Sequence, residues 1–360
     1  MLRALGASRY KVKFTIIVKS DTKRLFIHAP NIHTGGGLKL LQGIITSGTG
    51  NLVSAQLDER ARTLLRLPAG VTVKYVKPTF WSRLSAEWRL RYLHTEYLIV
   101  CPGGLPPLFS IRANAAVLAL NRLLVDGSRL NHFPLWPRGR IVVERLWFLR
   151  CQGHATSYVA QTQSMAVLLK NILRSNTDVT VIPFNDPAPQ QLIASVVPEK
   201  YDFVYPANGD AHKNHLRVLQ AWRLLADRGL KPTLALTIDG AVYPALLDQI
   251  LGDTRRFGLR ITNLGYLTQP AIRDLYASSG ALLFPSLTES FGLPLIEARE
   301  RGLPIIAPEL DYVRDVVSPT ETFDPESPVS MARAIRRFMG QSEVELKIFS
   351  TKELITELLK

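Results

Sequence analysis

The stretch ALLFPSLTESFGLPLIEA, residues Ala281–Ala298, passes from an apolar run through a polar loop into a second apolar run that begins with Leu293-Pro294. The run ALLFPS is typical of a buried strand that ends at a proline. Leu293-Pro294 is typical of a helix start, because proline is favoured at the first helical position. The sequence therefore predicts a strand–loop–helix unit whose loop, 289–293, lies where parallel α/β sheets bind ligands.

Two glutamates flank this loop. Glu289 belongs to the loop, and Glu297 is expected in the first turn of the helix. Unpaired amides at the helix N-terminus would hold a phosphate, and the two carboxylates would bind separate hydroxyl groups on either side of it. In the alternative interpretation, Glu297 only complements the helix dipole and Glu289 is a solvated loop charge.

The rest of the C-terminal half repeats this alternation of apolar runs and amphipathic segments. It predicts βαβ units and hence a parallel sheet covered by helices. The strand candidates are YDFVYP, PTLALTIDG, LRITNLGY, ALLFPS and LPIIAPEL. Between the first two, Val218, Ala221 and Leu225 share a helical face, and Gly229 stands where a C-terminal cap is expected.

The N-terminal half shows the same pattern less clearly, in RLFIHAP, TEYLIVCPGG, ANAAVLALNRLL and HATSYVAQT. The first of these leads through Gly35, Gly36 and Gly37 into a helix. Glycines there let a ligand approach the backbone closely, although a plain tight turn explains them as well.

Domain boundaries follow from length and composition. A chain of 360 residues exceeds the size at which single cores stop growing, which favours two domains. The segment 181–200 carries four prolines without a clean period, as an interdomain connection does. We expect an N-terminal domain over 1–182, a C-terminal domain over 183–340, and over 341–360 a terminal helix that packs back on the N-terminal domain.

The net charge of +14 is unevenly placed, since residues 1–182 hold 25 Lys and Arg against 8 Asp and Glu, whereas residues 183–360 hold 19 against 22. The basic half indicates an anionic partner: a membrane surface, a phosphorylated substrate or a nucleic acid. Nucleic acid is disfavoured, because no recognised binding module is present.

The apolar runs are too short for a membrane span or a signal peptide, which favours a cytoplasmic protein. Cys101 and Cys151 lack CxxC spacing and are expected to be buried thiols.

The segment 74–100 is rich in aromatic and basic residues. Large side chains recur in it at spacings of three, four and four residues, so they share one face of a helix: Trp81, Leu84, Trp88 and Tyr92. Arginines flank this face: Arg83, Arg89 and Arg91. This pattern is typical of an interfacial helix on an anionic membrane, which would make the protein peripheral at the inner face. The alternative is a helix whose aromatic face packs in the core.

The stretch FPSLTESFGLPLIEARERGLPIIAPELDYVRDVV resembles the donor-binding signature of retaining glycosyltransferases of family 4, also called glycosyl transferases group 1. The resemblance covers most of residues 201–340 and extends more loosely to HTGGGLKLL, CPGGLPPL and VAQTQSM. It implies a GT-B fold, in which two Rossmann-like doubly wound α/β domains face each other across a cleft. The C-terminal domain would bind a nucleotide-sugar donor, and the N-terminal domain would present the acceptor.

The resemblance also implies roles for individual residues. Glu297 matches a glutamate that bonds the ribose, Glu289 one that holds the donor sugar, and Lys213 a lysine that neutralises the departing diphosphate. The resemblance implies three further groups of donor-binding residues. The loop that contacts the sugar and the diphosphate has Ser290, Phe291, Gly292 and Leu293. The segment beside the base has Gly265 and Tyr266, and the glycine-rich turn has Gly35, Gly36 and Gly37.

The chain departs from the family pattern in two places. Asn208 stands where the family often has an arginine that pairs with the lysine, so the leaving group has one fewer cation. The position at which similar enzymes often carry a histidine corresponds to Asn121-Arg122. His33, in the loop before the glycines, would touch the donor or acceptor, or else is a solvated loop histidine. No catalytic histidine is therefore assigned.

The implied function is retaining transfer of a hexose from a nucleotide sugar to a glycan or lipid-linked acceptor, in assembly of a surface polysaccharide of the lipopolysaccharide or O-antigen kind. No DxD-like pair or His/Cys cluster is evident, so we expect a metal-independent reaction without a cofactor. Two alternatives remain: a GT-B nucleotide-sugar epimerase or hydrolase, and a catalytically weakened nucleotide-sugar-binding partner in a glycan-assembly complex.

Overall fold

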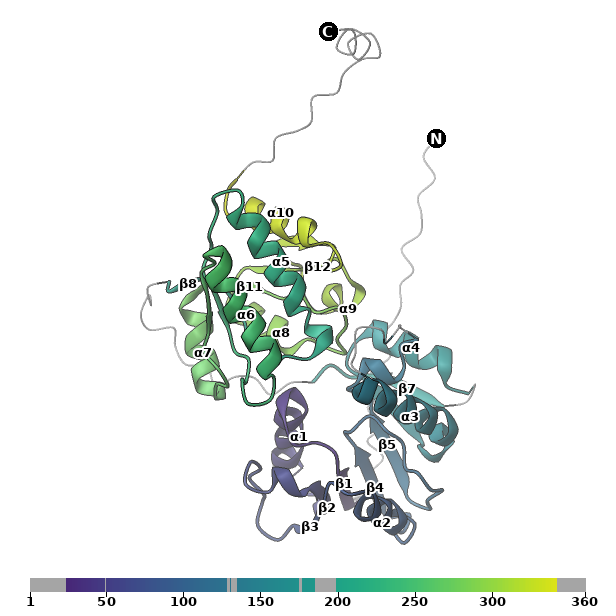
Figure 1. Ribbon diagram of the computed structural model, residues 1–360. Helices are drawn as coiled ribbons and strands as arrows, with labels where there is room; N and C mark the ends of the chain where they lie inside the picture. The colour runs from purple at the N-terminus through teal and green to yellow at the C-terminus, as the bar shows by residue number, and fades with distance from the viewer. Residues whose placement is uncertain are drawn as a thin grey trace, which may run out of the picture.

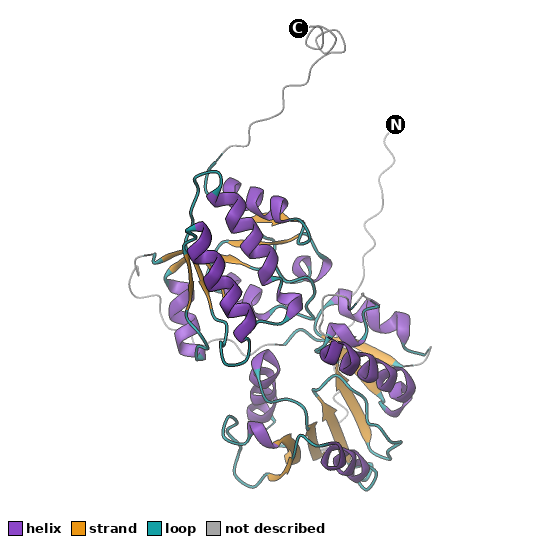
Figure 2. Ribbon diagram, in the orientation of Figure 1, coloured by secondary structure: helices purple, strands orange, loops and turns teal. Residues whose placement is uncertain are grey.

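The structure, a computed structural model, describes residues 24–48, 50–127, 130, 135–174, 177–184 and 199–341. These residues form two α/β domains, each with one parallel sheet covered by helices (Figures 1 and 2). The predicted fold class of two doubly wound domains is confirmed. The predicted helix over 341–360 lies outside the described residues except for Gln341, and so does most of the connection between the domains.

The N-terminal sheet has the strand order β3-β2-β1-β4-β5-β6-β7, with every pairing parallel. Its strands are β1 (Arg24–Ala29), β2 (Leu52–Asp58), β3 (Thr72–Val76), β4 (Tyr97–Cys101), β5 (Asn114–Leu118), β6 (Ser157–Ala160) and β7 (Asp178–Val181). Sequence reasoning missed β2, β3 and β7. Strands β3 and β7 are the sheet edges and carry polar, partly exposed residues, which weakens the apolar signal.

Four helices and three short 3-10 turns complete the described N-terminal domain. They are α1 (Gly35–Ser47), α2 (Phe80–Leu90), α3 (Leu135–Cys151) and α4 (Gln163–Ile172), with η1 (Glu59–Ala61), η2 (Arg122–Leu124) and η3 (Gln152–His154). The core has two parts, one under α1 around Ile27 and Leu41, and one around Phe148 and Tyr158. Cys101 and Cys151 are both buried free thiols, as predicted.

The C-terminal sheet has the order β10-β9-β8-β11-β12-β13, again all parallel. Its strands are β8 (Tyr201–Tyr205), β9 (Leu234–Leu236), β10 (Ile261–Asn263), β11 (Ser279–Leu283), β12 (Ile305–Pro308) and β13 (Glu321–Phe323). The five predicted strands are present. The edge strand β13 was missed, because a three-residue strand with one buried residue leaves no periodic pattern.

Helices of the C-terminal domain are α5 (His215–Ala226), α6 (Pro244–Phe257), α7 (Gln269–Ala277), α8 (Leu293–Arg299), α9 (Asp311–Arg314) and α10 (Pro328–Phe338), preceded by the turn η4 (Ala211–Lys213). The face of α5 predicted to be apolar is buried. Gly229 ends this helix at a φ of 77°, and the next amide, of Leu230, donates to Leu225 O at 3.0 Å. This pattern is the Schellman motif that a cap glycine permits.

The aromatic face of α2 is exposed. The residues that α2 buries are Ala86, Glu87 and Leu90, whereas Trp81 is 75% exposed and Trp88 44% exposed. The alternative in which the aromatic residues pack in the core is therefore wrong. Leu135 and Trp136 in the first turn of α3 are exposed as well.

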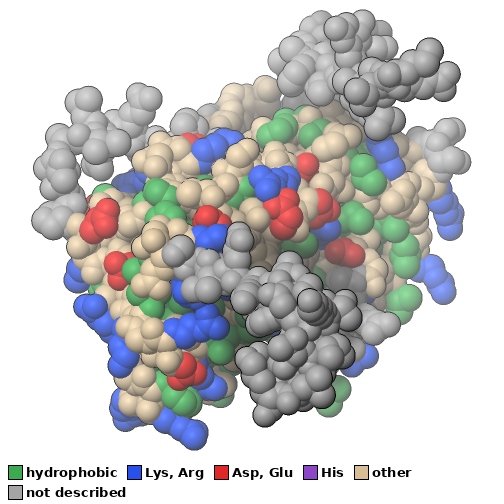
Figure 3. Space-filling view, turned by 90° about the horizontal axis from the view of Figure 1, so that it is seen from above, with side chains coloured by type: hydrophobic (Ala, Val, Ile, Leu, Met, Phe, Trp, Pro, Cys, Tyr) green, Lys and Arg blue, Asp and Glu red, His purple; other side chains and the backbone are tan. Residues whose placement is uncertain are grey.

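On the face seen from above, Lys and Arg side chains are interspersed with Asp and Glu (Figure 3). The C-terminal domain, residues 199–341, lies uppermost in Figure 1. Within the described residues, no helix combines the length and apolar character that a membrane span needs.

Candidate functional site

A cleft of about 2260 Å³ lies between the two domains. Its C-terminal wall comes from the loops that follow β8 and β11, and its N-terminal wall from the loop after β1 and from α2 and α3. In each sheet the strand order reverses at the first strand, between β1 and β4 and between β8 and β11. Ligands of doubly wound folds bind at the carboxyl ends of strands at such reversals, so the cleft has the expected location.

Glu289 lines the C-terminal wall and forms an ion pair with Lys213. The Lys213 Nζ to Glu289 Oε1 distance is 2.5 Å, and the two side chains are 17% and 15% exposed. The loops that carry them are tied together by the Leu287 amide, which donates to His212 O at 2.8 Å. The structure thus joins two residues that the sequence singled out separately.

Glu289 is ionised in this setting. Burial alone would raise its pKa, but the nearby charges of Lys213 and His212, together with hydrogen bonds from Lys213 and Ser286, outweigh burial and hold the pKa below its ordinary value. The interpretation of Glu289 as a solvated loop charge is therefore wrong. The site presents a fixed carboxylate beside a fixed ammonium group.

Glu297 lies one turn inside α8 rather than in its first turn. The helix begins at Leu293, as predicted, so Glu297 is its fifth residue and no acidic residue occupies the first turn. Its carboxylate is nearly buried and has two partners: Lys39 Nζ donates to Oε1 at 2.6 Å and Tyr276 Oη to Oε2 at 3.1 Å. Because Glu297 lies beyond the first turn and has these two partners, complementing the helix dipole is not its only role.

The loop before α8 combines buried and cleft-facing residues. Gly292, the N-cap, has a φ of 73°, and Phe291 is buried in the C-terminal core, so any ligand contact of Phe291 would use its backbone. Ser290 lines the cleft, and its Oγ donates to Leu120 O of the other domain at 2.7 Å. A Cβ on Gly36 would lie 3.0 Å from Leu293 Cδ1, so α1 and α8 touch at their first turns.

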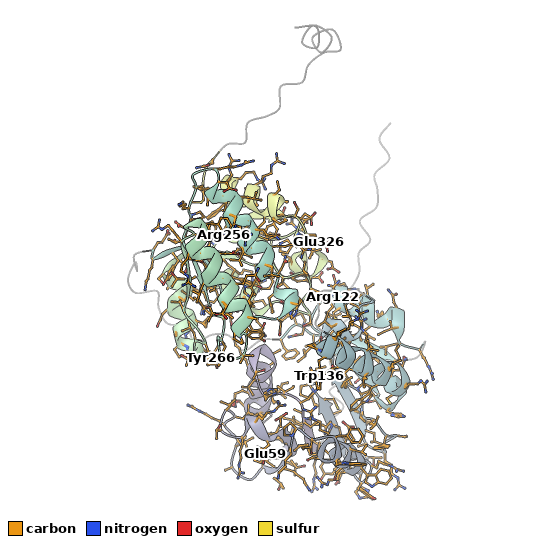
Figure 4. All side chains as sticks on the ribbon, in the orientation of Figure 1. Glu59, Arg122, Trp136, Arg256, Tyr266 and Glu326 are labelled. Carbon is orange, nitrogen blue, oxygen red and sulfur yellow. The ribbon has the colours of Figure 1, made fainter. Side chains whose placement is uncertain are left out.

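The other glycine-rich positions differ in their relation to the cleft. Gly35 starts α1 at a φ of 64°, and Gly37 lines the cleft. Gly265 has a φ of 72°, and Tyr266 is 78% exposed on the side of the C-terminal domain that faces α1 (Figure 4). Neither Gly265 nor Tyr266 lines the cleft.

Asn208, at the position where the family often has an arginine, is bonded to an acidic residue and not to another cation. Its Nδ2 donates to Asp210 Oδ2 at 2.8 Å, and Tyr243 Oη donates to Asp210 Oδ1 at 2.9 Å. The loop after β8 therefore carries an acidic residue near the expected position of a cation. Across the described residues, no group of three or more His, Cys, Asp or Glu side chains is placed to hold a metal ion.

Arg122 connects the domains. It lies at their junction (Figure 4) and donates to both carboxylate oxygens of Asp311 at 2.9 and 3.0 Å. The sequence singled out Asn121-Arg122 only as the position of an absent histidine, and Lys39 was not considered. No local pattern reveals either residue, because each contacts a partner more than 180 positions away, at separations of 189 and 258.

The N-terminal wall carries a second charged group of residues. Arg60 donates from Nε and Nη2 to the buried carboxylate of Asp58 at 2.9 and 2.7 Å, and Arg83 Nη2 lies 3.7 Å from the same carboxylate. His33 lies beside them, and its pKa is lowered by burial and then by the charge of Arg60. Arg60, Arg83 and His33 all line the cleft, which gives this wall an excess of cationic groups.

His215 makes the stability of the C-terminal domain depend on pH. Its Nε2 donates to Asn208 O at 2.7 Å, and burial lowers its pKa to about 4. The unfolded chain takes up this proton near pH 6.5, so the free energy of unfolding is highest above that pH and falls as the pH drops toward 4, by about 3 kcal/mol for this ring.

We therefore expect His215→Gln to show a smaller loss of stability than the unsubstituted protein between pH 7 and pH 5. Urea unfolding at a series of pH values measures the difference. His94→Gln, at an exposed position, is the control and should leave the pH dependence unchanged. Parallel pH profiles for His215→Gln and the unsubstituted chain would contradict this assignment.

Comparison with known proteins agrees with this architecture. A family model described as glycosyl transferases group 1 matches residues 193–350. The chain is 24% identical over 172 residues to the serotype-specific mannosyltransferase WbdA of Escherichia coli, covering 48% of this chain and 21% of that protein. It is 30% identical over 117 residues to the O-antigen chain mannosyltransferase B of Escherichia coli, covering 32% of this chain and 30% of that protein.

A solved structure extends the similarity to both domains. Alr3699/HepE of Anabaena, in complex with UDP and glucose, superimposes with a TM-score of 0.63 at 18% identity, covering 88% of this chain and 90% of that one. The matched segments span only about a fifth to a third of the length of the curated relatives. Residues 193–350 therefore match the glycosyl transferases group 1 family, and the two domains together have the GT-B fold.

Proposed function

We propose that this protein is a retaining hexosyltransferase that uses a nucleotide-sugar donor and a glycan or lipid-linked acceptor, in assembly of a surface polysaccharide of the O-antigen kind. The observation that carries the proposal is the Lys213–Glu289 pair, whose Glu289 lines the interdomain cleft at the strand reversal of the C-terminal sheet. The names of the similar proteins, two mannosyltransferases and a protein crystallised with UDP and glucose, support the donor class.

In this proposal Lys213 stabilises the negative charge that develops on the departing diphosphate. A prearranged ammonium group in a partly dry cleft is more effective at this than solvent, because it needs no reorganisation as the charge forms. Glu289 orients Lys213 and accepts hydrogen bonds from the donor sugar. The backbone amides from Ser290 to Leu293 contact the sugar and the diphosphate, and Glu297 binds the ribose. Gly35, Gly36 and Gly37 allow close approach from the other domain, and Gly265 and Tyr266 lie beside the base.

The acceptor hydroxyl would attack the anomeric carbon on the face from which the diphosphate departs, and a phosphate oxygen would take the proton. The configuration is then retained without an enzymatic base. Positive charge from side chains and amides substitutes for a metal ion, so the proposed reaction is metal-independent.

The experiment that tests the function incubates the purified protein with UDP-, GDP-, ADP- and dTDP-sugars, with and without a membrane extract that contains acceptors. We expect one donor to be consumed only when acceptor is present, with a new glycoside of retained configuration. Consumption without acceptor would favour the epimerase or hydrolase. Tight nucleotide binding without any transfer would favour the binding partner, for which the replacement of an arginine by Asn208 is the motivating observation.

Peripheral membrane binding is part of the proposal. Phe80 and Trp81 at the start of α2 are 70% and 75% exposed, and Trp136 at the start of α3 also lines the cleft (Figure 4). Exposed aromatic side chains beside arginines match the surface of interfacial helices on anionic lipid. This arrangement would bring the acceptor side of the cleft to the membrane.

We expect the protein to sediment with vesicles that contain phosphatidylglycerol and not with pure phosphatidylcholine vesicles, and to be released by salt. Replacing Phe80 and Trp81 together by Ser should reduce the bound fraction several-fold. Leu251→Ser, at an exposed apolar position of the C-terminal domain, is the matched control. Equal binding to both kinds of vesicle, or no effect of the double replacement, would contradict the proposed membrane surface.

A further inference from the structure

We propose that Lys39 of the N-terminal domain is the second cation of the donor diphosphate site, and that it is held on Glu297 until a ribose displaces it. This inference rests on the proposed function, since it assumes a nucleotide diphosphate in the cleft. It assigns a role to a residue of α1 that the group 1 signature does not include.

The contact itself joins the two domains. Lys39 Nζ lies 2.6 Å from Glu297 Oε1, and the two side chains are 26% and 12% exposed. One turn earlier in each helix, Gly36 meets Leu293. The first turns of α1 and α8 therefore meet where the two domains face each other, and the ammonium group of Lys39 lies beside α8.

Both carboxylate oxygens of Glu297 already accept a hydrogen bond in this arrangement. Oε1 accepts from Lys39, and Oε2 accepts from Tyr276, which is buried. Ribose hydroxyls and an ammonium group are both hydrogen-bond donors, so they compete for the same oxygen. In the proposed binding mode, a ribose hydroxyl takes the position of Lys39 on Oε1 and releases the ammonium group.

The released ammonium group has a defined anionic partner nearby. In a nucleotide sugar the diphosphate is attached to the ribose, so a diphosphate lies within a few bonds of the hydroxyls that replace Lys39. The flexible stem of lysine allows its compact charge to move by this amount while α1 stays in place. The released lysine therefore passes from the carboxylate of Glu297 to a phosphate.

The charge balance of the C-terminal wall creates the need for this second cation. Lys213 is already paired with Glu289, and Asn208, which stands where an arginine is frequent, is bonded to the acidic Asp210. One ammonium group shared with a carboxylate leaves a diphosphate incompletely neutralised. Lys39 supplies the missing charge from the opposite domain, so donor binding and the interdomain contact become linked.

Isothermal titration of a nucleoside and its diphosphate into the same variants tests this inference. The probes are uridine with UDP and guanosine with GDP, because the base is not assigned. For the unsubstituted protein we expect the diphosphate to bind much more tightly than the nucleoside. Lys39→Met should weaken binding of the diphosphate by about tenfold or more, as loss of a charged hydrogen bond does, and should leave the nucleoside binding equally well or better.

Two further variants separate charge from packing. Lys39→Gln retains a donor for Glu297 without the charge and should behave like Lys39→Met, whereas Lys39→Arg should retain most of the affinity for the diphosphate. Lys74→Met, at an exposed lysine of the same domain, should change neither affinity. Thermal unfolding of each variant verifies that it is folded.

Unchanged affinity of Lys39→Met for the diphosphate would overturn the inference while leaving the proposed function intact. An equal loss for nucleoside and diphosphate would overturn it as well, because a purely structural role weakens both. If the unsubstituted protein bound neither UDP nor GDP, nor any nucleotide sugar, the proposed function would fail and this inference with it.

Discussion

Lys213→Met is expected to lower kcat for glycosyl transfer by about 10²–10³-fold, the usual cost of removing one group that stabilises developing negative charge. Lys213 forms the ion pair with Glu289, at 2.5 Å. The effect should fall mainly on kcat, because the charge on the diphosphate grows as its bond to the sugar breaks. KM for the donor should change less. Steady-state kinetics with the donor identified by the screen provide the measurement.

The substitution also removes the ammonium partner of the buried Glu289, which raises the pKa of its carboxylate and costs stability. Arg223→Met is the matched control, since Arg223 pairs with the partly buried Asp253 in the same domain and does not line the cleft. Both variants should unfold at a lower temperature, but only Lys213→Met should lose turnover. Comparable kcat values for Lys213→Met and the unsubstituted enzyme would remove Lys213 from the chemistry.

Glu297→Gln is expected to weaken binding of nucleosides and nucleoside diphosphates alike, by about 10–100-fold, since hydrogen bonds to a charged group contribute about 1.5–3 kcal/mol each. Glutamine preserves the volume of the side chain, so the packing of α8 is retained. What changes is the charge that accepts the ribose hydroxyls, together with the carboxylate partner of Lys39 and Tyr276.

This result would differ in kind from that of Lys39→Met, which should affect the diphosphate alone. Isothermal titration with uridine, UDP, guanosine and GDP therefore distinguishes a side chain that binds the ribose, Glu297, from one that binds the diphosphate, Lys39. Glu309→Gln, at an exposed glutamate paired with Arg314, is the control and should bind like the unsubstituted protein. A Glu297→Gln variant with normal affinity for both kinds of probe would show that the ribose binds elsewhere.

Much of the architecture was predictable from local pattern. The strands β8, β11 and β12 are buried runs of apolar residues between glycines and prolines, and they were recognised. The edge strands β3, β7 and β13 were not, because a strand with one neighbour needs less apolar surface and carries less of the signal. The aromatic stripe of α2 was also recognised, although its pattern alone left open whether solvent or the core covers it.

The candidate site was predictable as a set of residues and not as a set of contacts. Glycine and proline around residues 292–294 mark a helix start by themselves, since Gly292 adopts a positive φ and proline fits the first turn. Lys213 and Glu289 are 76 positions apart in the sequence, and their ion pair was not predicted. The sequence analysis assigned Lys213 to the diphosphate and Glu289 to the donor sugar. The contacts of Tyr276 and Lys39 with Glu297 were not anticipated.

By itself the sequence determined the two α/β domains, the uneven charge and the strand–loop–helix unit that carries Glu289 and Glu297, because periodicity and backbone preferences act over a few residues. Tertiary structure alone decided which charges neutralise one another: Lys213 with Glu289 within one domain, and Lys39 with Glu297 and Arg122 with Asp311 between the domains. Such pairs depend on how two sheets and their helices pack, and Coulomb interactions respond to distance in space, which separation along the chain does not record.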